Sequence, residues 1–265
     1  MSYDRQWLES VGSEDAHAQS MWGLGVAVRY APNPSVHHLA KILFHQALPA
    51  LDSLTHSRPL AFCIVGLASY LHDYPDDPIV YGWLDQLSHK VWAFFHRHSS
   101  TEWPWFENHL TYSNAKLPHA LICAGHFLNN QAILQDGLHA LDWLFRIQVS
   151  QENTLSIIGN KHWYFKGAEK SDFDQQPVEA ISLIDALAEA FAQTRDEKWR
   201  THSHLCLGWF YGCNALNTPM PDLQTGGCSD GLEYESISYN QGAESTLSWL
   251  LSGLRLQEIE RFTCP

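Results

Sequence analysis

The helices that the sequence predicts alternate between two kinds, and this alternation restricts the folds open to the chain. One helix of each pair is apolar on most sides, and the next is amphipathic. The apolar helices begin near residues 14, 59, 116, 177 and 241, so the steps between them are 45, 57, 61 and 64 residues. A helix that is apolar all round must be buried on every face, whereas an amphipathic helix can face water.

Closing such pairs into a ring buries the first kind of helix inside and leaves the second kind outside. We therefore predict an all-α (α/α) toroid of helical hairpins that forms one domain over residues 1–265. An open helical solenoid is the alternative, but solenoids have regular repeats and short loops, whereas the connections here are long and irregular.

The composition indicates a globular protein with a large buried core. Hydrophobic residues make up 45% of the 265 residues and charged residues only 17%, unlike the composition of disordered chains. The formal net charge of -13 argues against a nucleic-acid partner, because phosphate contacts need lysine and arginine. No apolar run reaches the roughly 18 residues of a membrane span, so we expect no membrane partner.

The cysteines are spaced like buried thiols and not like a disulfide framework or a zinc motif. None forms a CxxC pair, and three lie inside predicted apolar helices. The N-terminal segment lacks the basic and apolar regions of a signal peptide. We therefore predict a reduced, cytoplasmic protein. The six are Cys63, Cys123, Cys206, Cys213, Cys228 and Cys264.

Three loops of similar chemical character each precede an apolar helix. They cover residues 101–114, 171–179 and 226–244 and are rich in carboxylates, amides and, in the first, tryptophan. In a toroid, the N-termini of the inner helices and the loops before them meet at one end of the ring. We therefore expect a pocket at that end, lined by these side chains.

The first loop contains the sequence WPWFE, which places Glu107 among aromatic residues. Desolvation favours the protonated form of a carboxyl group, which a general acid needs. Trp103 and Trp105 could stack on a sugar ring, and Asn114 could bind a hydroxyl group. The structural alternative is that the two tryptophans hold the loop in place by packing, while Glu107 hydrogen-bonds to backbone N–H groups.

The second loop reads SDFDQQPVEA. Pro177 fits the first turn of a helix, Asp174 stands where a cap belongs, and Glu179 follows in the first turn. Capping explains Asp174 but accounts poorly for Gln175 and Gln176, because amides that both donate and accept suit hydroxyl-rich ligands.

The third loop and the first helix supply the remaining candidates. Polar groups crowd the start of the last helix, which favours a binding site there over a purely structural role. The residues of that stretch are Asp230, Asn240, Gln241 and Glu244. Near the first helix, Asp15 and His17 are further substrate-binding candidates, although His17 is only one of 16 histidines.

The sequence lacks the signatures of several other mechanisms. It has no HExxH, no G-x-S-x-G elbow, no P-loop and no GxGxxG after a strand, so we expect neither a metal nor a cofactor. Carboxylates that occur with amides and aromatics indicate carbohydrate chemistry, and glycoside cleavage needs two carboxyl groups. The catalytic candidates are Glu107, Asp174, Glu179, Asp230 and Glu244. The sequence leaves open whether cleavage would retain or invert the configuration at the anomeric carbon.

Four phrases of the sequence resemble a bacterial family of toroidal domains. They are SYDRQWLESVGSEDAHAQSMWGLG, WPWFENHLTYSNAKLPHAL, FDQQPVEA and CSDGLEYESISYNQGAESTLSWLL. Members of that family are labelled glycosyltransferases or glycosidase-like proteins and are linked to glycosyltransferases or mannoside phosphorylases. The resemblance implies a fold like that of the six-hairpin glycosidases, and it implies sugar handling more firmly than any particular reaction.

The sequence departs from the family pattern in two places. Relatives have a longer N-terminal part, so we expect a ring that is short of about one hairpin. The phrase that reads DSHGR in relatives is DAHAQ here, from Asp15 to Gln19. Loss of the arginine removes a bidentate partner for a carboxylate. Both departures favour a protein without the full activity of the family.

Two classes of function therefore stay open. The first is a carbohydrate-active enzyme that hydrolyses or transfers glycosides on a sugar or oligosaccharide without a metal. The second is a non-catalytic glycan-binding or scaffold domain that serves a glycosyltransferase partner. An open ring would also leave apolar flanks that favour homo-oligomers.

Overall fold

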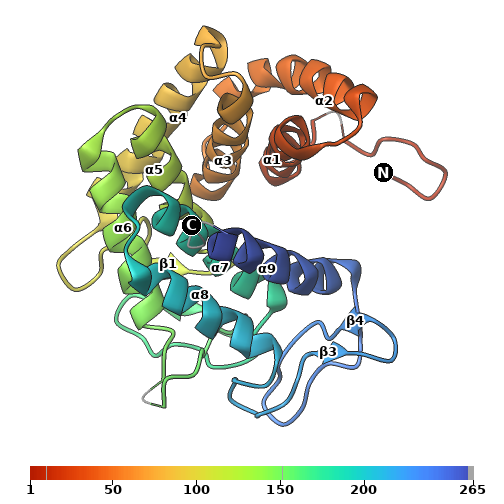
Figure 1. The fold of residues 1–265 in the computed structure, drawn as a ribbon, viewed down its shortest axis with the longest axis vertical. Helices are drawn as coiled ribbons and strands as arrows, with labels where there is room; N and C mark the ends of the chain where they lie inside the picture. Colours follow the sequence, from red (N-terminus) through yellow and green to blue (C-terminus); the bar gives the residue numbers. More distant parts are fainter. Residues whose placement is uncertain (10, 151, 262–265) are drawn as a thin grey trace. The chain divides into compact units, whose positions relative to one another are not determined.

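The computed structural model describes residues 1–9, 11–150 and 152–261. The described chain is mostly helical, and it divides into two compact units, Met1–Val91 and Trp92–Pro265. The division falls within helix α4 (Pro78–His98). The single-domain assignment stays a prediction, and the two units are described in turn (Figure 1).

The first unit is built from helices that begin close to the predicted positions. It contains α1 (Glu14–Tyr30), α2 (Pro34–Ala47), the 3₁₀ helix η1 (Leu48–Ser53), α3 (Ser57–Asp73) and the first part of α4. The hydroxyl of Ser13 accepts the Ala16 N–H at 3.1 Å and caps α1. Helix α2 ends at Ala47, because Pro49 has no N–H to continue the α-helical ladder.

Helices α1 and α3 pack backbone against backbone and lie side by side in Figure 1. A Cβ atom added to Gly25 would lie 2.1 Å from the carbonyl oxygen of Gly66, and one added to Gly66 would lie 2.6 Å from that of Met21. Only glycine permits so close an approach. The small residues of the first predicted helix therefore set the distance between two helices.

Among its described residues, the second unit contains the remaining helices and four two-residue strands. Its full helices are α5 (Lys116–Phe127), α6 (Gln131–Arg146), α7 (Pro177–Thr194), α8 (Glu197–Phe210) and α9 (Ala243–Arg261). Helix α5 packs on α6 and α7, and α7 packs on α8 and α9. Strands β1 (His109–Leu110) and β2 (Tyr164–Phe165) pair antiparallel, as do β3 (Pro221–Asp222) and β4 (Gly227–Cys228).

Two short features shape the connections of the second unit. Residues Tyr164 and Phe165 form strand β2. Helix α8 ends at Phe210. Gly212 follows with a φ of 96° and reverses the chain.

The predicted burial of the apolar helices is confirmed for three of them. Helix α3 is buried at every position from Ser57 to Leu71, and α5 and α7 are buried along most of their length. The prediction is wrong for α1, which buries one stripe formed by Ala18, Met21, Gly25 and Val28. The close glycine crossing draws that stripe onto α3, and the other positions of α1 are partly or fully exposed.

The prediction is also wrong for α9, which buries serines and exposes leucines. The hydroxyls of Ser248 and Ser252 each donate to the carbonyl four residues earlier at 2.7 Å, so they need no partner outside the helix. The exposed face consists of Leu247, Leu250, Leu251 and Leu254. Small side chains allow α9 to lie close to α7, which turns the leucines away from that contact.

None of the described helices combines the length and apolar character that a membrane span requires. Within the described residues, Cys63, Cys123, Cys206 and Cys228 are buried thiols and Cys213 is exposed. Cys264 lies outside the described residues.

We expect Gly25→Ala to lower the free energy of unfolding by about 1 to 3 kcal/mol, because the new methyl group has no room against the backbone of α3. Gly23→Ala is the matched control on the same helix, because a Cβ there meets no atom within 4 Å. The control should gain about 0.5 to 1 kcal/mol from the better helix former. Urea unfolding measures both, and equal effects would contradict the close contact.

Candidate functional site

Hydrogen bonds join the three loops that the sequence singles out. The first loop is joined to the second by the Glu179 carboxylate, which accepts the N–H groups of Ser113 and Asn114. The Gln175 N–H donates to the Leu232 carbonyl at 2.9 Å, and the Leu232 N–H donates back at 2.8 Å. We call the joined segments 101–114, 171–179 and 226–244 the loop surface. It contains twelve of the sequence-predicted residues, among them carboxylates that lie more than a hundred positions apart.

Glu179 anchors the start of α5. Its carboxylate accepts the N–H of Ser113 and, at 3.2 Å, the N–H of Asn114. The side-chain amide of Asn114 donates to the same carboxylate at 3.3 Å and also bonds both backbone groups of Thr111. Glu179 and Asn114 are only 5% and 1% exposed. Glu179 and Asn114 therefore link the backbone just before α5 to the first turn of α7.

Gln175 is a buried junction of the second unit. Its carbonyl oxygen accepts from the Trp209 indole N–H at 2.7 Å and from the Ile157 N–H at 3.3 Å. Its amide nitrogen donates to the Asp172 carbonyl at 2.8 Å. Gln175 is 0% exposed, so its side chain does not face solvent. It joins the loops through these hydrogen bonds.

Asp230 has the same kind of role at the start of α9. Its carboxylate accepts the Gly242 N–H at 2.7 Å and the side-chain amide of Asn240. Burial alone would raise the pKa of Asp230, but hydrogen bonds from Ser245, Gly242 and Asn240 outweigh it and lower that pKa. Gln241 accepts the Thr225 hydroxyl at 2.8 Å. These contacts fix the last segment of the loop surface.

The two tryptophans of the first loop lie in the core. Trp103 is 4% exposed, and its indole N–H donates to the Glu107 carbonyl at 2.7 Å. Trp105 is 0% exposed and packs its ring near Trp143 and edge-on to Phe106. The faces of both rings are therefore occupied by other side chains in this conformation.

The remaining candidates of the loop surface keep more contact with solvent. Glu107 is partly exposed, with its carboxylate 3.7 Å from the imidazole of His109. Asp174 is partly exposed and does not cap α7, which corrects the sequence prediction. Gln176 is the N-cap residue instead, and no side chain caps that helix. Glu244 is exposed in the first turn of α9.

Asp15 and His17 belong to the first unit, where they lie in the first two turns of α1. Within the described residues, the buried Nε2 of His17 has no hydrogen-bond partner. Their neighbour Glu14 holds the backbone just before α3, since its carboxylate accepts the N–H groups of Thr55 and His56, each at 3.1 Å. Burial opposes ionisation, but these hydrogen bonds prevail and lower the pKa of Glu14 to about 2.

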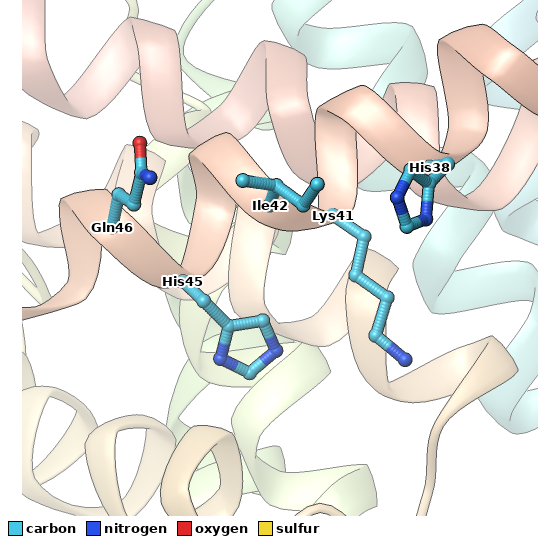
Figure 2. Close-up of a pocket in the computed structure, with 5 residues that line it drawn as sticks. All are labelled: His38, Lys41, Ile42, His45 and Gln46. Carbon is cyan, nitrogen blue, oxygen red and sulfur yellow. The ribbon is translucent and has the colours of Figure 1, made fainter.

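The first unit also carries a surface hollow of about 500 Å³ on α2. Figure 2 shows its lining, which is formed by His38, Lys41, Ile42, His45 and Gln46. The Lys41 ammonium lies 3.4 Å from the centre of the Tyr74 ring, and His45 lies 2.8 Å from the Tyr70 hydroxyl. None of the sequence-predicted residues lines this hollow.

A buried ionic network in the second unit was not predicted from the sequence. The Lys116 ammonium on α5 lies 2.6 Å from the carboxylate of Asp185 on α7. The Arg255 guanidinium on α9 approaches the other oxygen of Asp185 at 3.1 Å. Lys116 is 1% exposed and Asp185 is 9% exposed. Charged residues inside helices that otherwise read as apolar are the signal that could have revealed this network.

The network shifts the titration of its members. Burial would raise the pKa of Asp185, but Lys116, Arg255 and His119 lower it to about 2. Burial, followed by the charge of Lys116, lowers the pKa of His119 to about 3. Near neutral pH this unit therefore holds a fixed carboxylate between two cations and beside an uncharged imidazole. Such perturbed clusters are candidates for functional sites.

Three solved structures are similar to this chain in fold. A sugar epimerase from a ruminal bacterium has a TM-score of 0.63 and 12% identity, over 94% of this chain and 73% of that chain. An unsaturated glucuronyl hydrolase specific for heparin has a TM-score of 0.64 and 11% identity, over 94% of this chain and 69% of that chain. A cellobiose 2-epimerase from Bacillus thermoamylovorans has a TM-score of 0.59 and 11% identity, over 92% and 74%.

These neighbours have the (α/α)6 toroid fold, and the likeness confirms the predicted fold class. At 11% to 12% identity it shows the fold alone. No protein-family model matches the sequence, and the search of curated proteins finds no match.

We expect Glu179→Ala to lower the free energy of unfolding by about 1 to 3 kcal/mol, because it leaves the buried N–H groups of Ser113 and Asn114 without an acceptor. Glu244→Ala is the control, since that carboxylate is exposed in the first turn of α9. Its effect should stay within about 0.5 kcal/mol. Denaturant unfolding compares the two variants, and similar losses would contradict the anchoring role of Glu179.

We expect Asp185→Asn to lower the free energy of unfolding by about 3 to 5 kcal/mol near pH 6, because it breaks a buried ion pair. The folded-state pKa of Asp185, about 2, lies below its usual value of 3.8. Its contribution is therefore complete above pH 3.8 and is lost as the pH falls toward 2.

Urea titrations should show that the difference in the free energy of unfolding between wild type and Asp185→Asn becomes smaller over that acidic range. Asp172→Asn serves as the control, because Asp172 is 63% exposed and pairs with Lys170 at 2.9 Å. If the free energies of unfolding of wild type and Asp185→Asn differ by the same amount at neutral and acidic pH, the ionised form of Asp185 does not stabilise the fold.

Proposed function

We propose that this protein is carbohydrate-active and that a sugar or oligosaccharide binds to the loop surface of the second unit. Proteins of the same fold include a sugar epimerase, a glucuronyl hydrolase and a cellobiose 2-epimerase, and this supports a carbohydrate-processing role. The observation that carries the proposal is the joining of three distant loops by the bonds of Glu179 to Ser113 and Asn114 and by the Gln175–Leu232 bridge.

The loop surface offers groups that suit a hydroxyl-rich ligand. Glu179, Gln175 and Asp230 hold its backbone, so the surface is preorganised. Glu107, Asp174 and Glu244 keep contact with solvent, and the amide of Gln176 is only partly buried. Carboxylates and amides can both bind sugar hydroxyls, because together they offer donors and acceptors. Asn240 and Gln241 lie at the exposed edge of the same surface.

The reaction that these residues support is glycoside hydrolysis or glycosyl transfer without a metal. Glu107, in the aromatic loop, would donate a proton to the departing glycosidic oxygen. Asp174 would activate the attacking water or acceptor hydroxyl, or would itself attack the anomeric carbon. The distance between these two carboxyl groups in the complex with substrate selects between the inverting and retaining routes.

The second candidate function is a non-catalytic glycan-binding or scaffold domain that partners a glycosyltransferase. The observation in its favour is that the carboxylates of Glu179 and Asp230 accept hydrogen bonds from backbone N–H groups. The buried Trp103 and Trp105 also present no open face for stacking. Binding without turnover is the result that this function predicts.

For the enzymatic proposal, we expect Glu107→Gln and Asp174→Asn each to reduce turnover on a substrate found by screening. The loss should be on the order of 100-fold or more, as for removal of a general acid or base. Glu235→Gln is the matched control, because Glu235 is an exposed carboxylate of the same surface. Its turnover should match that of the wild type.

Calorimetry with a panel of glycans separates the two functions. Binding together with turnover supports the enzyme, and binding without turnover by the wild type supports the second candidate. Full turnover by both Glu107→Gln and Asp174→Asn would remove these residues from the mechanism. Absence of binding to every glycan would contradict both functions.

A further inference from the structure

Three potential metal ligands meet between α5 and α7. One ligand atom each from His119, Cys123 and Glu189 lies within 4.8 Å of the other two. His119 and Cys123 are four residues apart on α5, so they face the same way. Glu189 lies on α7, which packs directly against α5. Packing of two helices thus brings an imidazole, a thiol and a carboxylate together.

The burial of His119 is a second, independent observation. This side chain is only 4% exposed. Its Nδ1 atom is buried and has no hydrogen-bond partner among the described residues. An unsatisfied polar atom in the interior is costly, so such an atom calls for an explanation. A bound cation would satisfy a ring nitrogen at this position.

We propose that His119, Cys123 and Glu189 form a binding site for Zn²⁺ or a similar borderline-soft divalent cation. Imidazole, thiolate and carboxylate are all established zinc ligands. Zinc bonds of about 2.0 to 2.3 Å place tetrahedral ligand atoms roughly 3.3 to 3.8 Å apart. Small side-chain rotations bring atoms that now lie within 4.8 Å into that range.

The charges of the site also fit a divalent cation. Cys123 would bind as a thiolate and release its proton to solvent, and Glu189 contributes a second negative charge. Together they neutralise a dication, which avoids a net charge in the interior. The imidazole of His119 supplies a ring-nitrogen lone pair to the metal.

The surroundings hold the ligands in place. The Gln193 amide donates to the Glu189 carboxylate at 2.8 Å, and such outer partners orient metal ligands. The Lys116–Asp185 ion pair joins the same two helices one turn toward their N-termini. Three protein ligands leave a fourth position for water or an added ligand, as in open zinc sites. This site is separate from the residues proposed to bind sugar.

Metal titration of the full chain tests the site directly. The protein is stripped with a chelator and titrated with Co²⁺, which reports thiolate ligation through a charge-transfer band, and then with Zn²⁺ in competition. We expect one ion per chain and the thiolate band in the wild type. Cys123→Ala should lose the band, and Glu189→Gln should bind at least about tenfold more weakly.

Two further cysteines supply matched controls. Cys206→Ala removes another buried thiol, and Cys213→Ala removes an exposed one. Both should keep the wild-type affinity and spectrum. Zn²⁺ should raise the Tm of the wild type and of both controls, because it binds the folded state. The Tm of Cys123→Ala should not respond.

The proposal is overturned if Cys123→Ala keeps the thiolate band, or if Cys213→Ala removes it. Circular dichroism of the metal-free variants shows whether they are folded. Should Cys123→Ala fail to fold, Glu189→Gln still decides the matter, because unchanged affinity in that variant excludes the carboxylate as a ligand. None of these measurements depends on carbohydrate binding.

Discussion

Carboxylates that hold the backbone in front of a helix are the interaction on which both units depend. The first N–H groups of a helix have no partner within it, and they carry the positive end of its dipole. Glu14 accepts N–H groups of the residues just before α3 and Glu179 accepts those of residues just before α5, each from the first turn of another helix of its own unit. Asp230 does the same at the start of α9. Apolar helices that lack side-chain caps of their own can therefore begin at buried positions.

This interaction explains why acidic residues at helix starts are ambiguous in a sequence. A carboxylate in such a place can be a cap or a catalytic group, and both roles select the same residue types. In this protein, Glu179 and Asp230 are caps, whereas Glu107 and Asp174 keep access to solvent. The caps give the loop surface its rigidity, and a rigid surface is what a specific sugar site needs.

Helices α5, α7 and α9 of the second unit have charged side chains between them as well as polar contacts near their ends. Lys116 and Asp185 join α5 to α7, and Arg255 ties α9 to the same carboxylate. His119 and Cys123 lie on the same α5, close to Glu189 of α7. Buried charges are costly unless they are paired, so this network constrains how the three helices pack. The proposed metal site uses the same helix pair.

The sequence by itself determined the class of fold. Alternation of apolar and amphipathic helices is a local signal that was read correctly for α3, α5 and α7 but not for α1 and α9, and Pro177 at the start of α7 was also read correctly. It also located the three loops, because runs of amides and carboxylates before apolar segments are visible without a structure. Only the tertiary structure decided which acids are caps, that α9 turns its serines inward, and that Lys116, His119, Cys123, Asp185 and Glu189 meet. Those outcomes depend on which helix packs against which, and contacts between residues far apart in the chain leave no periodic pattern in the sequence.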